Sequence, residues 1–169
     1  MKSLKSITKS LRDIAVRIAQ DIELQKLLIS DVRNVQQENY TPLSVNEMLE
    51  QHYILLTPQN EKSIQNMGRN TFLIITIQDV NFESQDANST ANGNIFVVTD
   101  IDHAMINNEE ERSMAIADRL IQDLDNLKLS ASVALTITSM SRIAYTETLC
   151  GLQIRFKIGE QINQKEVDF

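Results

Sequence analysis

The sequence predicts an α+β domain with a mainly antiparallel sheet of about four or five strands, flanked by two main helices. Apolar residues recur at three- and four-residue steps over Leu4–Gln20 and Glu109–Leu127, which is typical of amphipathic helices. Segments rich in β-branched residues, such as Thr71–Gln78, predict strands. The 169 residues, 42% hydrophobic and 23% charged, fit one globular domain spanning residues 1–169.

Residues 1–29 are expected to form an N-terminal helical region. A second short helical stretch, Ile22–Leu28, follows the first helix. A basic amphipathic helix also suits a membrane surface or a transit peptide, but Asp13, Asp21 and Glu23 disfavour the transit peptide. We therefore expect the first helix to pack on its own domain or on a neighbour. No apolar run approaches the roughly 18 residues of a membrane span, so no membrane association is predicted.

Residues 31–70 show the weakest pattern. Ser44 followed by Glu47 predicts a capping box at the start of a short helix. Two short apolar clusters lie here: Val45–Leu49, which follows this cap, and Tyr53–Leu56, which has no assigned structure.

Two strands are predicted at Thr71–Gln78 and Asn94–Asp102, with the first apolar on both faces. Residues 79–93 between them are almost wholly polar, and Asn92–Gly93 is a turn signal. We expect a long hairpin loop over 79–93 that projects from the body and contacts a partner, since structureless connections of this length are uncommon in compact domains.

The second main helix is predicted over Glu109–Leu127. Asn108 is the expected N-cap with Glu111 at the third position, and the acidic run Glu109–Glu111 complements the helix dipole. Its expected apolar face consists of Met114, Ala117, Leu120, Ile121, Leu124 and Leu127.

The last two strands are predicted at Ala131–Thr138 and Leu149–Ile158. The latter alternates cleanly, with Leu152, Ile154, Phe156 and Ile158 on one face. The C-terminal tail, 159–169, is polar and is expected to fray or to dock on a neighbour through Val167 and Phe169.

Charge is unevenly distributed along the chain. The first 20 residues carry a net charge of +4, so the remainder carries −11, since the total is −7. Residues 79–125 contribute −9. This acidic stretch is either a solvated surface, a patch for a basic partner, or a wall that keeps DNA from adhering.

One cluster, Asp100-x-Asp102-His103, has residue types that bind metal ions. Alternation puts both carboxylates on the same face of a strand end, where they could chelate a hard cation. No further ligand lies at an obvious spacing, and turn-forming Asp at a strand end explains the pattern equally well. We therefore predict no metal and no other cofactor.

No candidate nucleophile or base has the context that catalysis needs. Cys150 lies within a predicted strand, which favours an inert buried thiol. Ser113, Ser139 and Ser141 lack a nucleophile-elbow motif, and His52 has no evident partner. No phosphate-binding glycine pattern is present. The prediction is a protein without catalytic, cofactor-binding or metal-binding residues, and not an enzyme.

The order of elements resembles the neck and tail-completion proteins of tailed bacteriophages, especially tail terminators. The residues that carry this resemblance are Leu27–Leu28 in the N-terminal helical region, the strand NIFVVTDID at 94–102, the Arg112-x-x-x-Ile116 helix, and the strand entered through Gly151 that continues to Phe156. The resemblance implies a homo-oligomeric ring, commonly a hexamer, around a DNA channel, with no catalytic residues.

The function expected from this resemblance is structural. The protein would be a ring-forming subunit of the virion that joins the capsid and portal to the tail, contacting itself and neighbouring neck, portal or tail proteins while DNA passes without specific binding. The alternative is a non-enzymatic adaptor or a secretion-apparatus subunit that binds protein partners.

Overall fold

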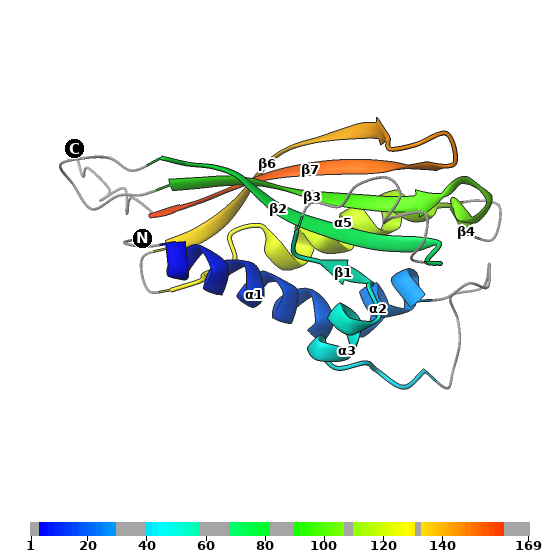
Figure 1. Cartoon of the computed structure of the whole chain (residues 1–169), viewed down its shortest axis with the longest axis horizontal. Coiled ribbons are helices and arrows are strands. Elements are labelled where there is room, and N and C mark those ends of the chain that lie inside the picture. The colour runs from blue at the N-terminus through cyan, green and yellow to red at the C-terminus, as the bar shows by residue number, and fades with distance from the viewer. Residues whose placement is uncertain are drawn as a thin grey trace, which may run out of the picture.

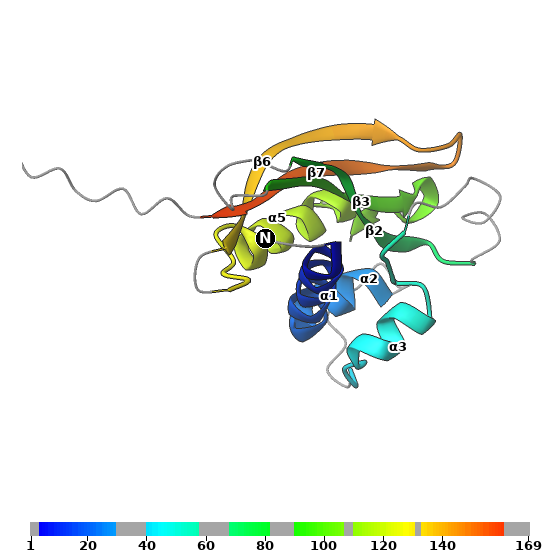
Figure 2. The same ribbon diagram turned by 60° about the vertical axis from the view of Figure 1, so that its left-hand side comes forward.

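The computed structural model describes residues 4–29, 40–57, 68–81, 90–106, 110–130 and 133–160. It confirms the α+β class: a five-stranded sheet is packed against helices (Figure 1). The helices gather on one side of the sheet, as the second view makes plain (Figure 2). The architecture is therefore two-layered, with the core between the helices and one sheet face.

The sheet has the order β1-β2-β3-β7-β6. Its strands are β1 (Ile54–Leu55), β2 (Thr71–Asn81), β3 (Thr90–Asp100), β6 (Val133–Ala144) and β7 (Leu149–Glu160). Every pairing is antiparallel except that of β1 with β2. A separate two-stranded ladder joins β4 (Met105–Ile106) to β5 (Glu110–Glu111).

The helices are α1 (Leu4–Gln20), α2 (Ile22–Ile29), α3 (Val45–Glu50) and α5 (Arg112–Leu124), with a 3-10 turn at Ile101–His103. The bounds of α1 match the prediction, and α2 confirms the second helical stretch. The capping box at the start of α3 is also confirmed, because Ser44 and Glu47 exchange both of its hydrogen bonds.

The main core lies under the helices. From α1 it receives Ile14 and Ile18, from α5 Ile116 and Leu120, all fully buried. The sheet contributes alternate residues, including the four predicted in β7: Leu152, Ile154, Phe156 and Ile158. The opposite face of the sheet carries a smaller buried cluster, Leu55, Phe72, Ile74, Val98 and Leu149, as expected for a β2 that is apolar on both faces.

The hairpin between β2 and β3 corrects the sequence prediction. The ladder extends to the pair Asn81–Thr90, so the ends of the expected 79–93 loop are strand, and 82–89 lies outside the described residues. Asn92–Gly93 is not a turn. A Cβ on Gly93 would collide with the Phe156 ring and the Thr76 carbonyl oxygen, so this glycine is required by a close approach inside the sheet.

The second main helix is shorter than predicted. It begins at Arg112 because Glu110–Glu111 pair with β4, and it ends at Leu124. Its N-cap is Glu111, without a side-chain capping bond, so the predicted capping by Glu111 at the third position is wrong. Met114, expected in the core, is exposed. Asn108 and Glu109 lie outside the described residues.

The ends of the last strands also differ from the prediction. β6 continues to Ala144, well past Thr138, and β7 includes Gly159 and Glu160 from the expected tail. β3 ends at Asp100, where the 3-10 turn replaces the expected last two strand residues. Residues 161–169 lie outside the described part.

Arg112 is fully buried at the start of α5 and joins three segments. Its guanidinium donates to the carbonyl oxygens of Leu27 (2.9 Å) and His103 (3.0 Å). Its backbone amide donates to the Ala104 carbonyl oxygen (2.7 Å). Leu27 lies in the last turn of α2, where carbonyl groups lack helical partners and a cation is favoured. Arg112 thereby fixes α2 and the 3-10 turn against α5.

Candidate functional site

The Asp100, Asp102 and His103 cluster forms a local turn. Asp100 caps the 3-10 turn, its carboxylate accepting from the Asp102 amide at 2.9 Å. His103 lies 3.7 Å from Asp100 and its other ring nitrogen is 3.1 Å from the Asn70 side chain. Within the described ranges, no group of three or more His, Cys, Asp or Glu residues could hold a metal ion.

The other sequence candidates are dispersed. Cys150 is half-buried in β7, and burial together with the Glu111 and Asp100 carboxylates raises the pKa of its thiol, so it is protonated near neutral pH. Ser113 donates its hydroxyl hydrogen bond to Glu111 (2.6 Å). His52 adopts φ 63° after α3. Ser139 and Ser141 are exposed on β6. The carboxylate that the Ser113 hydroxyl meets, Glu111, is itself bound by Arg142.

Glu111 connects α5 to the sheet edge instead of capping the helix. Both of its carboxylate oxygens accept from Arg142 on β6, at 2.9 and 2.7 Å. The hydrogen bonds from Arg142, followed by that from Ser113, lower the pKa of Glu111. The residue is therefore ionised at neutral pH and part of an exposed ion pair.

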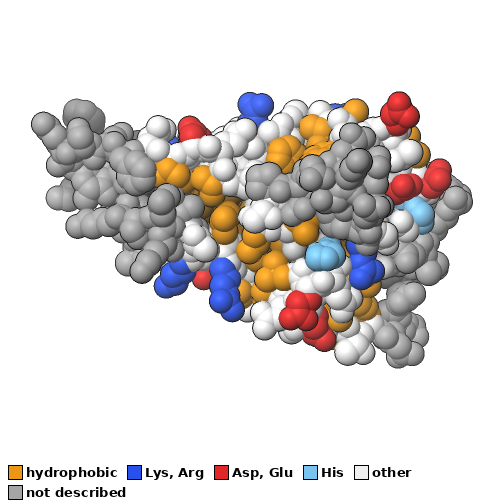
Figure 3. Space-filling model, viewed as in Figure 1, with side chains coloured by type: hydrophobic (Ala, Val, Ile, Leu, Met, Phe, Trp, Pro, Cys, Tyr) orange, Lys and Arg blue, Asp and Glu red, His pale blue; other side chains and the backbone are white. Residues whose placement is uncertain are grey.

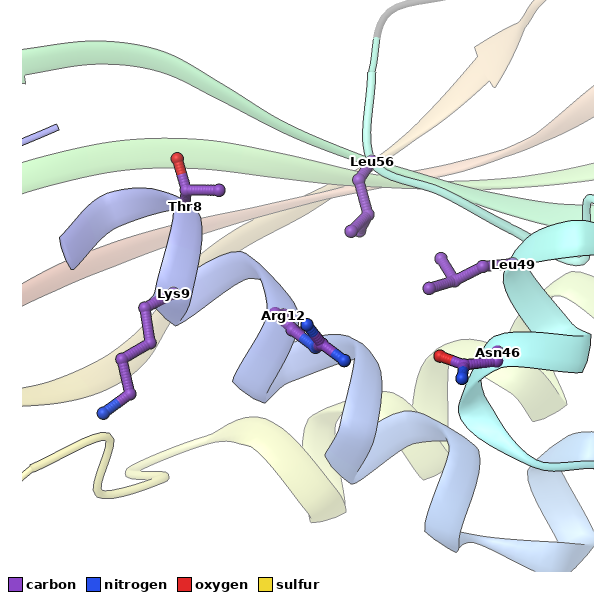
Figure 4. Close-up of a pocket in the computed structure, with 6 residues that line it drawn as sticks. All are labelled: Thr8, Lys9, Arg12, Asn46, Leu49 and Leu56. Atoms are coloured by element: carbon purple, nitrogen blue, oxygen red, sulfur yellow. The ribbon is translucent and has the colours of Figure 1, made fainter. Parts of the chain in front are cut away.

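A groove of about 650 Å³ lies between α1 and α3. Its lining residues are Thr8, Lys9, Arg12, Asn46, Leu49 and Leu56. Figure 4 shows Leu49, Leu56 and Asn46 facing α1, with Arg12 extending toward Asn46. Lys9 lies one turn away at the rim, and its side chain extends away from the two leucines. The volume is in the range of known ligand sites.

The α1 wall follows from the helix period. Ile14, Ala15 and Ile18 are buried against the domain, which leaves Thr8, Lys9 and Arg12 on the exposed side. Two ion pairs fix the end of α1 to α5: Arg17 with Asp123 (2.9 Å) and Arg119 with Asp21 (2.6 Å). α1 therefore presents Thr8, Lys9 and Arg12 as one wall of the groove.

The ion pairs Arg17–Asp123 and Arg119–Asp21 form a clamp between the end of α1 and α5, in which the two aspartates are neighbours. Burial alone would raise the pKa of Asp21, but hydrogen bonds from Arg119 and from the Leu24 amide outweigh it and lower that pKa. Burial and the Asp21 carboxylate raise the pKa of Asp123. The clamp therefore depends on an ionised Asp21.

The α3 wall is positioned by a buried glutamine. Gln25 of α2 donates to the carbonyl oxygens of Ala19 (2.6 Å) and Leu43 (2.9 Å) and accepts from the Leu43 amide (2.8 Å). It also accepts from the Tyr40 hydroxyl at 2.6 Å. The capping box then starts α3, so that Met48 enters the core and Leu49 lines the groove.

The groove floor next to Leu56 is held by β1. Tyr53 receives a hydrogen bond from the Leu73 amide (2.9 Å), which docks the segment on β2. Arg69 stacks on the Tyr53 ring at 4.4 Å and donates to its hydroxyl at 2.9 Å. These contacts fix the short strand that the sequence did not reveal.

The groove combines positive charge with apolar surface. In the part of the chain that the structure describes, no ion pair involves Lys9 or Arg12, and no acidic residue is among those that line the groove. Figure 3 shows hydrophobic side chains on this face of the molecule with Lys and Arg side chains beside them, and Asp or Glu side chains below them. The groove suits an amphipathic acidic peptide better than a neutral or basic ligand.

Sequence reasoning did not find this groove. Arg12 was expected only on the polar face of a helix, Leu49 in the short helix after Ser44, and Leu56 in an apolar cluster without an assigned structure. The sequence contained one signal: residues 31–70 hold two short apolar clusters, and one of them, Tyr53–Leu56, belongs to no predicted helix or strand.

Neither a protein-family model nor a curated protein matches the chain. Among the described residues, no helix is both long and apolar enough to cross a bilayer.

Proposed function

We propose that the protein is a structural virion subunit of the neck or tail junction of a tailed bacteriophage, a tail terminator or head-tail connector that assembles as a ring, expected to be a hexamer. The proposal comes from the resemblance in element order. A structural feature supports it: among the described residues, the distal half of β6 pairs only with β7, which leaves an outer sheet edge suited to contact between subunits.

The two halves of β6 differ along their outer edge. The first half is covered, since the Leu135 amide donates to the Leu127 carbonyl oxygen (2.9 Å) and the Ile137 amide to Asp125 (3.0 Å). From Thr138 to Ala144, the described residues provide no backbone partner except β7. Figure 2 shows the β6–β7 hairpin reaching beyond α5.

The open half has few features that prevent pairing. Arg142 is its only charged residue, it lacks proline, and Met140 is 41% exposed. An open strand edge of this kind is a template for a strand from another chain, and natural proteins usually protect such edges with lysine or proline. A ring repeats one contact between neighbouring subunits, so a strand edge that forms this contact would be used by every subunit.

The mass of the native assembly tests the proposal. Native mass spectrometry should give a multiple of 19.2 kDa, and electron microscopy should show rings. Met140→Lys places a charge on the open edge and should reduce assembly. Thr136→Lys, on the covered half of the same strand, is the matched control and should assemble normally. A chain that stays monomeric at high concentration and in its native particle would refute the ring.

The location of the chain separates the neck protein from an adaptor or secretion-apparatus subunit. Mass spectrometry of purified virions should detect the protein, and portal, terminase and major capsid genes should lie beside its gene. Rings recovered only from a cell-envelope or secretion fraction would favour the secretion subunit.

A further inference from the structure

We infer that the groove between α1 and α3 binds residues 161–169 of a neighbouring copy of the chain. The inference rests on the proposed function because it supplies a specific contact between adjacent subunits of the ring. It is carried by the chemistry of the groove and of that segment.

The groove offers two kinds of contact. Arg12 and Lys9 form a positive wall and rim, while Leu49 and Leu56 provide apolar surface on the facing side (Figure 4). Both Leu side chains are half-buried, so apolar surface remains accessible. A ligand that carries acidic and apolar groups on opposite sides would satisfy both.

The segment after β7 has this pattern. Glu166 and Asp168 alternate with Val167 and Phe169, so an extended backbone places the two carboxylates on one side and the two apolar side chains on the other. When the segment lies along the groove, the two carboxylates would face Arg12 and Lys9. Val167 and Phe169 would then contact Leu49 and Leu56. Nine residues follow Glu160 in the sequence, enough to span about 30 Å when extended.

The direction of β7 favours a neighbouring copy over the same chain. β7 ends at Glu160, on the side of the sheet near the start of α1, and the strand itself points away from α3 in both views (Figures 1 and 2). The same chain would have to reverse direction and pass around α1 to enter its own groove. The segment of an adjacent subunit can enter without this reversal.

Peptide binding tests the groove. A fluorescein-labelled peptide of residues 159–169 should bind a protein that lacks 161–169, as measured by fluorescence anisotropy. The double variant Lys9→Glu with Arg12→Glu should weaken binding by about tenfold, because two attractions become repulsions. Lys157→Glu, an exposed basic residue on β7, is the matched control and should bind normally.

Changes in the peptide keep the test independent of protein folding. Replacing Glu166 and Asp168 with Lys should abolish binding to the unaltered groove and restore it to the charge-reversed groove. Replacing Val167 and Phe169 with Ser should weaken binding without changing the charge. Equal binding of all these peptides, or binding unaffected by Lys9 and Arg12, would overturn the inference.

A mixing experiment separates the two copies. One protein lacks 161–169 and keeps its groove; the other keeps 161–169 and carries Lys9→Glu with Arg12→Glu. Both proteins also carry Met140→Lys, which reduces pairing through the β6 edge. Contact between copies then predicts that the mixture forms a heterodimer while each protein alone stays monomeric, seen by native mass spectrometry. A mixture that fails to associate, while the peptide binds, would assign the segment to its own chain and overturn the inference as stated.

The outcomes are distinguishable from those for the proposed function. If the peptide does not bind the groove, and rings still form when Lys9 and Arg12 are both replaced with Glu, this contact is refuted while the proposed ring stands. Heterodimers that form in a protein absent from virions would refute the neck function and leave this contact intact.

Discussion

Replacing Arg112 with Met should lower the free energy of unfolding by about 3 kcal/mol. Met removes the charge with little loss of volume but leaves the carbonyl oxygens of Leu27 and His103 without the donors at 2.9 and 3.0 Å. A hydrogen bond that involves a charged group contributes roughly 1.5–3 kcal/mol, and the cost of burying the guanidinium offsets part of the sum of two. Since domains are typically stable by about 5–15 kcal/mol, this is a large fraction.

Urea unfolding followed by circular dichroism measures this change. Arg112→Lys retains one donor group and should lose an intermediate amount, because one ammonium cannot span both carbonyl oxygens. Arg155→Met, at an exposed position of β7, is the control and should change stability by less than about 0.5 kcal/mol. A loss below about 1 kcal/mol for Arg112→Met would show that the two carbonyl groups do not depend on this side chain.

Three further predictions concern the clamp, the sheet and the acidic turn. Because the folded-state pKa of Asp21 lies below its usual value of 3.8, ionised Asp21 stabilises the fold above that pH, and this stability is lost as the pH falls through the folded-state pKa. The difference in unfolding free energy between wild type and Asp21→Asn should therefore shrink on acidification. A difference that stays constant with pH would contradict the ion-pair clamp. Gly93→Ala should destabilise the domain by about 2 kcal/mol, measured by thermal unfolding, because the new Cβ collides with Phe156 and the Thr76 carbonyl. Gly68→Ala is the contrasting variant, since that site has open space around it but a positive φ. Unchanged stability of Gly93→Ala would show that β3 and β7 separate easily. The double variant Asp100→Asn with Asp102→Asn should assemble normally and should contain the same amount of metal as wild type by elemental analysis, since both residues shape a turn. Loss of a bound cation in this variant would reveal a metal site there.

The elements that the sequence revealed are those whose burial follows one period. α1 and β7 each bury one regular set of side chains, so their spacing is legible without knowledge of the partner element. β1 has no period because it is two residues long, and its place depends on Tyr53 docking on β2.

The remaining errors arise from contacts between distant segments. The start of α5 was misplaced because Glu110 and Glu111 pair with β4, an interaction that local capping preferences do not contain. Gly93 was read as a turn because only the Phe156 ring across the ladder explains a glycine there. The groove combines α1, α3 and the residue after β1, which no spacing in the sequence brings together.

The strand order has a consequence for how the chain is made. β7 is the last strand in the sequence, yet it lies between β3 and β6. During synthesis, β3 therefore waits with one edge unpaired and β6 has no sheet partner until residues 149–160 have left the ribosome. Exposed apolar edges of this kind favour aggregation, and pairing between distant segments is slow. Nascent chains that stall before Leu149 should be the species that require chaperones, whereas the completed chain closes its sheet in one late step.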